Sequence, residues 1–161
     1  MTPGSILIIG YGNTLRGDDG FGPLAARLLE ERAIPGVEVI IAHQLNPELA
    51  ASLAEARFAV FIDATEGSTP GAITVTSVEL RDIGPSGATH YFEPGTLLAL
   101  AKFVYGQAPE AVLITAVARS FEHGEEISSE MREAARRVVD AVANLAASDR
   151  LDYDSLREAL R

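Results

Sequence analysis

The stretch ILIIGYGNTLRGDDGFGP, residues 6–23, decides how this chain begins to fold. Its first four residues are all apolar and predict a buried strand. Gly10 and Gly12 then allow the backbone to turn sharply, and an amphipathic helix begins near the end of the stretch. Two neighbouring carboxylates, Asp18 and Asp19, therefore lie between the carboxyl end of a strand and the start of a helix. Open α/β sheets place their binding sites at such positions.

The glycines of this stretch are arranged much as in a dinucleotide-binding loop, but two features exclude that interpretation. The pattern Gly-x-Gly-x-x-Gly requires a third glycine at the position where this chain has Leu15. A pyrophosphate would also be repelled by Asp18 and Asp19. A simpler alternative is that one aspartate caps the following helix. That role accounts for one carboxylate of the pair and leaves the other unexplained.

The composition indicates a single globular domain and argues against several classes of protein. The chain has 161 residues, of which 47% are hydrophobic and 22% charged, which is enough for one sizeable core. Its net charge of −10 and its single lysine, Lys102, argue against binding to nucleic acid or an anionic membrane. Cysteine is absent, which excludes thiolate metal sites and cysteine nucleophiles. The sequence contains no recognisable signal peptide or membrane-spanning run, so we expect a cytoplasmic protein, and we expect a monomer.

The remainder of the chain alternates between predicted strands and helices. Strands are expected at residues 37–41, 58–62, 73–78 and 111–117, and helices at 47–56, 94–105 and 129–147. This alternation predicts an α/β fold, a three-layer sandwich in which a five-stranded, mostly parallel sheet has helices on both faces. Residues 73–78 alternate apolar and polar and predict a half-exposed edge strand. Residues 1–148 are expected to form one domain, followed by a charged tail at 149–161 with one short helical turn.

Three residues that can bind metal follow the carboxyl ends of predicted strands, namely Asp19, Asp63 and His90. If the second and third strands lie on either side of the first, Asp19 and Asp63 border the switch point where such folds bind ligands. Two carboxylates and an imidazole suit nickel or zinc, and three protein ligands leave coordination positions open. Without a metal, adjacent carboxylates would raise one pKa and form an acid–base pair. The simpler alternatives are that Asp63 caps its strand and that His90 is an ordinary loop histidine.

A Mg²⁺-dependent phosphoacceptor domain is a second interpretation, because such domains also have an acidic pair after the first strand and an aspartate after the third. Here Asp18 and Asp19 lie well past the end of their strand. No lysine follows the strand at 111–117, and Arg119 is the nearest cation. The phosphoacceptor interpretation therefore fits less well. The motifs of serine hydrolases and P-loop proteins are absent.

Residues 10–22 resemble the opening motif of the nickel–iron hydrogenase maturation proteases. In that family a strand leads into Gly-x-Gly-Asn, a short loop and a pair of acids, and the second acid, Asp19 here, is a metal ligand. The family's second ligand is an aspartate at a strand end in an Ile-Asp-Ala context, which Asp63 matches. Its third ligand is a histidine shortly before an apolar helix, which His90 matches. The resemblance extends over residues 5–145.

The resemblance implies an aspartic-type endopeptidase, a hydrolase that removes the C-terminal extension of the hydrogenase large-subunit precursor after nickel has been inserted. It implies that Asp19, Asp63 and His90 are both the metal-contacting and the catalytic residues. The nickel is then contributed by the substrate rather than by a resident cofactor. Residues 43–48, with the sequence HQLNPE, resemble the subgroup linked to bidirectional hydrogenases and are expected to select the partner. A non-catalytic, nickel-recognising maturation chaperone is the alternative from another class.

Overall fold

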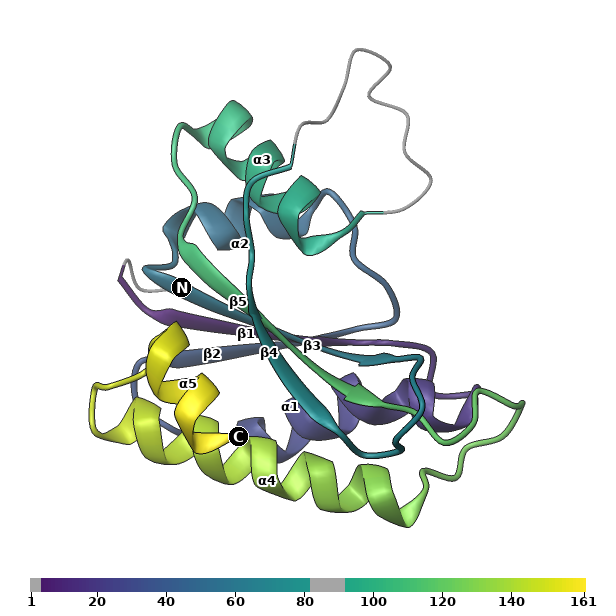
Figure 1. The fold of residues 1–161 in the computed structure, drawn as a ribbon. Coiled ribbons are helices and arrows are strands. Elements are labelled where there is room, and N and C mark those ends of the chain that lie inside the picture. Colours follow the sequence, from purple (N-terminus) through teal and green to yellow (C-terminus); the bar gives the residue numbers. More distant parts are fainter. Residues whose placement is uncertain (1–3, 82–91) are drawn as a thin grey trace.

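A computed structural model describes residues 4–81 and 92–161, and a five-stranded sheet forms its centre (Figure 1). The strand order is β2-β1-β3-β5-β4. The strands are β1 (Ile6–Tyr11), β2 (Val37–Ala42), β3 (Phe58–Thr65), β4 (Ile73–Ser77) and β5 (Glu110–Val117). The helices are the short 3-10 helix η1 (Gly17–Gly20), α1 (Phe21–Glu31), α2 (Leu49–Glu55), α3 (Pro94–Tyr105), α4 (Ser129–Ala147) and α5 (Tyr153–Ala159). The predicted α/β fold is confirmed.

The central strands run parallel and the edge strand β4 runs the other way. β1 pairs in parallel with both β2 and β3, so that Ile8 lies opposite Val39 and Val60. The apolar run of β1 is buried on both faces, which explains why it does not alternate with polar residues. β4 pairs antiparallel with β5 at the edge of the sheet, as the alternation of residues 73–78 predicted. The switch point lies between β1 and β3, also as predicted.

The helices form two layers, with α1, α4 and α5 on one face of the sheet and α2 and α3 on the other (Figure 1). Successive side chains of a strand point to opposite faces. Ile6 and Ile8 therefore belong to the hydrophobic core under α1 and α4, whereas Leu7 and Ile9 belong to the core under α2 and α3. Two separate hydrophobic cores enclose the sheet, and the predicted three-layer sandwich is confirmed.

Several element boundaries differ from the sequence-based expectation, and two of these differences have a clear structural cause. β3 does not end at residue 62 but continues to Thr65, because its last residues pair with the end of β5. Asp63 consequently lies inside a strand rather than after it. The helix expected to begin at Pro47 begins at Leu49, because the Asn46 Oδ1 accepts a hydrogen bond from the Glu48 N–H at 3.0 Å and forms a turn instead of a cap.

Residues 149–161 are charged, yet they contain the helix α5. The Asp152 side chain accepts a hydrogen bond from the Ser155 N–H at 2.7 Å and caps this helix. Leu151, Leu156 and Leu160 are buried in the core that α1 and α4 share with the sheet. Among the residues that the structure describes, no helix is both long and apolar enough to cross a membrane.

Candidate active site

A cavity of about 450 Å³ lies at the carboxyl ends of β1 and β3, at the predicted switch point. Tyr11 from the end of β1, Asp19 from η1 and Asp63 from β3 line it, together with His43 and Asn13 from neighbouring loops. The structure thus brings Asp19 and Asp63 into one crevice, as the sequence predicted from the strand order. Both side chains are partly buried, so each faces the cavity without being sealed from solvent.

The glycines of the opening motif allow the backbone to pass close enough to place Asp19. A Cβ atom at Gly22 would overlap the carbonyl oxygen of Ile62, so the first turn of α1 lies directly against β3. A Cβ atom at Gly12, whose φ is +151°, would overlap the carbonyl oxygen of Asp19. Larger residues at either position would push η1 away from the sheet. The motif is therefore a device for close packing at the end of β1.

Asn13 joins Asp19 to the loop that precedes it. The Asn13 N–H donates to the Asp19 Oδ2 at 2.6 Å, and the Asn13 Oδ1 accepts from the Leu15 N–H at 2.9 Å. The second bond is a side-chain-to-backbone contact that shapes the turn after Asn13. The Asp19 Oδ1 accepts no hydrogen bond from the described part of the chain, and it remains available to a substrate.

Asp63 has an unusual proton affinity for a carboxylate. Its burial raises its pKa to about 7, and the nearby charge of Asp19 acts in the same direction. Hydrogen bonds from the Ala64 N–H, at 2.8 Å to Oδ1, and from the Tyr11 hydroxyl lower this pKa but do not cancel the effect of burial. The pKa of Tyr11 is raised by burial and by the charge of Asp63, so its hydroxyl keeps its proton. Asp63 can therefore hold or release a proton near neutral pH.

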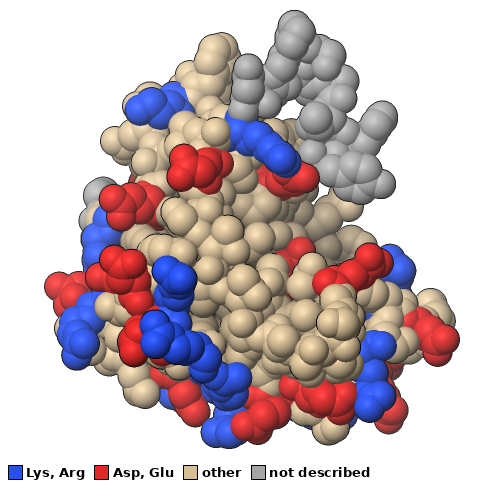
Figure 2. Space-filling view, in the orientation of Figure 1, with Lys and Arg blue, Asp and Glu red and all other residues tan. Residues whose placement is uncertain are grey.

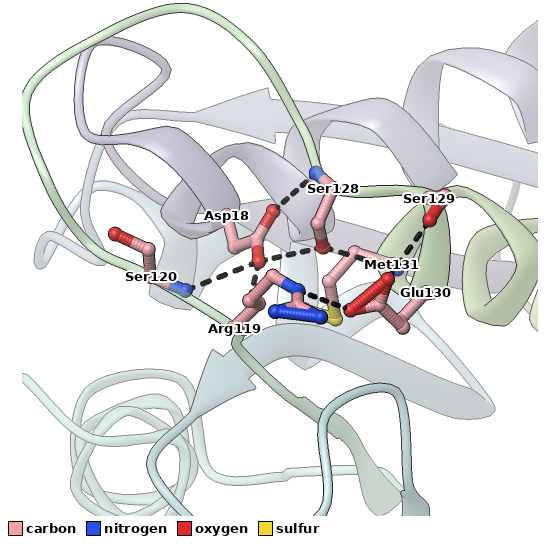
Figure 3. Close-up of polar contacts among 7 residues, drawn as sticks. All are labelled: Asp18, Arg119, Ser120, Ser128, Ser129, Glu130 and Met131. Atoms are coloured by element: carbon pink, nitrogen blue, oxygen red, sulfur yellow. Dashed lines mark hydrogen bonds and ion pairs between the residues drawn. The ribbon is translucent and has the colours of Figure 1, made fainter.

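Asp18 serves a different purpose from its neighbour (Figure 3). Its side chain is 2% exposed and turns toward the loop between β5 and α4. The Arg119 N–H donates to its Oδ2 at 2.8 Å and the Ser120 N–H at 3.4 Å, while Ser128 donates from its N–H at 2.7 Å and from its Oγ at 2.8 Å. Burial acts to raise the pKa of Asp18, but these hydrogen bonds outweigh burial and lower it. Asp18 does not cap α1, whose N-cap residue is Gly20.

Two residues of the cavity were not singled out by the sequence pattern as site residues. Tyr11 lies between the two glycines of the motif and follows Leu7 and Ile9 at two-residue spacing, so strand periodicity could have placed it on the face of Asp63. His43, which belongs to the segment expected to select the partner, lines the cavity while remaining exposed. Its position after β2 brings it to the same edge of the sheet.

The third predicted site residue, His90, lies outside the residues that the structure describes. Phe92, two residues further on, lines the cavity. Within residues 4–81 and 92–161, no three histidine, aspartate or glutamate side chains are close enough together to hold a metal ion. The described part of the site therefore presents two carboxylates, Asp19 and Asp63, and carboxylate oxygens are groups that divalent cations can bind.

Comparison with solved structures identifies close relatives of this fold. The nickel–iron hydrogenase maturation protease HycI of Thermococcus kodakarensis KOD1 is 30% identical, with a TM-score of 0.71 over 89% of this chain and 92% of that one. A hydrogenase 2 maturation peptidase of a Thaumarchaeota archaeon is 28% identical, with a TM-score of 0.68 over 91% and 99% of the two chains. The hydrogenase maturating endopeptidase HybD of E. coli, 20% identical with a TM-score of 0.69 over 89% and 93%, supports the fold alone.

No protein-family model matches the sequence, and a comparison with curated proteins gives no match. The 30% identity to HycI extends over 89% of this chain and 92% of that one. That level and extent of identity indicate common descent rather than a shared architecture alone. This chain belongs to the nickel–iron hydrogenase maturation protease family.

Proposed function

We propose that this protein is an endopeptidase that removes the C-terminal extension from the nickel-loaded precursor of a hydrogenase large subunit. The observation that carries the proposal is the convergence of Asp19 and Asp63 on one crevice in a member of this family. The crevice lies at the carboxyl edge of the sheet, where open α/β folds bind their ligands. The protein is expected to act as a cytoplasmic monomer, which size-exclusion chromatography and cell fractionation can test.

The substrate's nickel is the expected recognition element. Asp19 and Asp63 supply two oxygen ligands, and His90, on the sequence resemblance, supplies a nitrogen ligand. A nickel ion already bound by the precursor needs only a few further ligands, which fits an incomplete site better than a closed one. The interaction would hold the scissile peptide bond beside the two carboxylates. Cleavage would then be faster because the reacting groups are already held in the right geometry.

Hydrolysis of the peptide bond adds a hydroxyl group to the carbonyl carbon and a proton to the leaving nitrogen. Asp63, with a pKa of about 7, can accept the proton of the attacking water and return one to the nitrogen. Alternatively, Asp63 binds the nickel together with Asp19, and the metal polarises the carbonyl oxygen. Replacing nickel in the precursor by other divalent metals separates these two routes. If the metal polarises the carbonyl oxygen, the cleavage rate should rise with the Lewis acidity of the metal. If Asp63 transfers the proton without help from the metal, the rate should not follow that acidity.

The segment at residues 43–48 is proposed to select the partner. His43, Gln44 and Leu45 line the cavity, so this segment is placed to contact whatever enters it. Its resemblance to the subgroup linked to bidirectional hydrogenases suggests a precursor of that kind. Exchange of the segment for that of another subgroup, followed by cleavage assays with both precursors, would test this choice.

The two alternatives make different demands on the site. A phosphoacceptor domain needs both acids of the pair beside Asp63, but Asp18 is buried and bound to Ser128. This geometry does not favour that alternative. A nickel-recognising chaperone would use the same crevice without cutting the precursor, and only activity distinguishes it from a protease.

The decisive experiment is a cleavage assay with nickel-loaded and nickel-free precursor. We expect the loaded precursor to be shortened and the nickel-free precursor to stay intact. The variants Asp19→Ala, Asp63→Ala and His90→Ala should be inactive, whereas Asp154→Ala, a change at an exposed residue of α5 that does not line the crevice, should be as active as the wild type. An intact nickel-loaded precursor after incubation with the wild-type protein would overturn the protease proposal. Binding of that precursor without cleavage would favour the chaperone.

A further inference from the structure

A second cavity of about 540 Å³ adjoins the crevice of Asp19 and Asp63. Tyr11 and Asp63 line both cavities, so the two share a wall. Thr76 of β4 and Leu113 of β5 line the second cavity but not the first, and Asp19 lines only the first. We name this second space the β4 cavity. Nothing in the proposed chemistry of the two carboxylates uses it.

The β4 cavity lies on the sheet face that carries α2 and α3. Thr76 pairs with Leu113 across β4 and β5, and side chains directly opposite each other in a sheet point to the same face. Tyr11 and Asp63 share this face with Ile9 and Phe61, whose side chains pack under α2 and α3. The crevice therefore continues across the sheet from the end of β1 to the edge strand.

The far wall of the β4 cavity is firmly built. After β4 the chain is attached to the start of α3, because the Arg81 N–H donates to the Gly95 carbonyl oxygen at 3.0 Å. A Cβ atom at Gly95 would overlap the carbonyl oxygen of Glu79, so only a glycine allows this approach. An ion pair between Arg81 and Glu93 joins the same two segments. Contacts within the chain thus hold this wall of the cavity in place.

The surface around β4 suits an extended polypeptide. Residues 73–78 carry no charge, and the space-filling view shows a largely uncharged area over β4 with charged side chains toward its margins (Figure 2). The Val78 N–H donates to the Ala111 carbonyl oxygen at 3.0 Å. Because backbone groups alternate in direction along a strand, those of Ser77, which lines the cavity, face away from β5. An added peptide strand could pair with such an edge.

We propose that the β4 cavity binds the C-terminal extension of the precursor in an extended conformation. This inference rests on the proposed function and adds the site that holds the released peptide. The nickel stays with the large subunit, so the chain on that side of the scissile bond occupies the cavity that contains Asp19. A peptide bond positioned at Asp63, which borders both cavities, then directs the extension into the β4 cavity.

Two tryptophan substitutions on β4 test this assignment. Thr76→Trp fills the β4 cavity, whereas Thr74→Trp is the matched control, because Thr74 is exposed on the same face of the same strand but does not line the cavity. We expect Thr76→Trp to raise KM for the nickel-loaded precursor at least about tenfold, because it removes binding without altering the reacting groups. Thr74→Trp should keep the wild-type KM. Equal melting temperatures of the two variants would show that both are folded.

A synthetic peptide with the sequence of the extension provides a readout that does not depend on cleavage. We expect a fluorescently labelled peptide to bind the wild type and Thr74→Trp and not to bind Thr76→Trp. Wild-type KM and wild-type peptide binding in Thr76→Trp would overturn the assignment. The wild-type protein could also fail to cleave the precursor and still bind the peptide, with Thr76→Trp abolishing that binding. In that case the proposed protease function is wrong, but the assignment of peptide binding to the β4 cavity is supported.

Discussion

Asp18 and Asp19 are neighbours in the chain, but they belong to two different regions of the molecule. Asp18 is held by donors from Arg119, Ser120 and Ser128, and its pKa is lowered. Asp19 faces a crevice with Asp63, where donors are fewer and burial raises the pKa of Asp63 to about 7. Burial alone therefore does not decide the charge of a carboxylate. The number of hydrogen-bond donors directed at it decides the outcome.

The two regions are also coupled through the backbone. Asp18 attaches the loop that carries Asp19 to the loop between β5 and α4, which the Gly17 N–H reinforces by donating to the Gly124 carbonyl oxygen at 2.7 Å. Ser128 caps α4 through its Oγ and donates to Asp18 from the same atom. We call the contacts of Asp18 with Arg119, Ser120 and Ser128 the clamp; it holds the backbone of the neighbouring Asp19, the proposed site residue. Substitutions in the two regions should separate stability from activity.

The largest expected effect is loss of activity in the crevice. If Asp19 acts as proposed, Asp19→Ala should lower cleavage of the nickel-loaded precursor by more than about a thousandfold. The fold should be unchanged, because Asp19 accepts one hydrogen bond, from Asn13, and contributes little to the core. Cleavage assays and circular dichroism check the two halves of this prediction. A circular dichroism spectrum of an unfolded chain for Asp19→Ala would contradict the prediction that Asp19 supports activity while Asp18 supports stability.

Substitution in the clamp should mainly lower stability, whereas substitution of Asp19 should mainly lower activity. Asp18→Ala removes the acceptor for three buried or partly buried backbone N–H groups, and we expect a loss of about 3 kcal/mol or more in the free energy of unfolding. Urea unfolding measures this loss. Ser120→Ala is the control, because Ser120 donates to Asp18 from its backbone, and it should change stability by less than about 0.5 kcal/mol. Equal stability of Asp18→Ala and the wild type would show that the clamp is dispensable.

The pH dependence of stability should differ in sign between the two regions. The pKa of Asp63 is higher in the folded protein than in the unfolded chain, so the folded state binds more protons between about pH 4 and pH 7 and its stability falls as pH rises through that range. Asp63→Asn removes this penalty and should be more stable than the wild type at pH 8, by at most about 4 kcal/mol and by less where solvent screens the partly buried side chain.

At pH 3 the advantage of Asp63→Asn should disappear, because Asp63 is then protonated in both states. Asp18 makes the contrary contribution, since its lowered pKa stabilises the fold above its unfolded pKa and this stability is lost as pH falls through the folded value. Urea unfolding of both proteins between pH 3 and pH 8 tests the sign. A pH-independent difference between Asp63→Asn and the wild type would refute the raised pKa.

A smaller effect is expected where the clamp meets α4. Ser128→Ala removes one hydrogen bond to Asp18 and the N-cap of α4, and we expect a loss of about 1–2 kcal/mol. Ser129→Ala is the matched control, because the Ser129 Oγ donates only to Glu130 at the surface. Thermal or urea unfolding of the pair would measure the difference. Identical stability of the two variants would show that Ser128 does not support the clamp.

The smallest expected signal is the metal content of the purified protein. Two carboxylates, one of them half protonated at neutral pH, form a weak site until a substrate supplies further ligands. We therefore expect metal analysis after dialysis to find far less than one nickel or zinc ion per chain. A stoichiometric ion would mean that His90 or other groups complete a resident metal centre.

Much of the site followed from the sequence, because its strands are short, apolar and separated by glycine-rich turns. The apolar run at residues 6–9 predicted a buried strand, and the expected strand order brought Asp19 and Asp63 to one edge of the sheet. The extension of β3 past Asp63 did not follow, because it depends on pairing with the end of β5. The local sequence pattern of the charged segment 149–161 also did not predict that its residue Leu156 is buried in the core.

The amino-acid sequence by itself determined that two acids would follow a glycine-punctuated strand and that one of them would meet Asp63 at the switch point. It also carried the family resemblance, because the motif is contiguous. Only the tertiary structure decided that Asp18 turns away and Asp19 turns inward. The family resemblance had already favoured Asp19, and the structure adds the cause: Asp18 is bound by donors more than 100 residues away in the chain, such as Arg119 and Ser128. The pKa of Asp63 was decided in the same way, because burial and neighbouring charge are properties of the folded molecule.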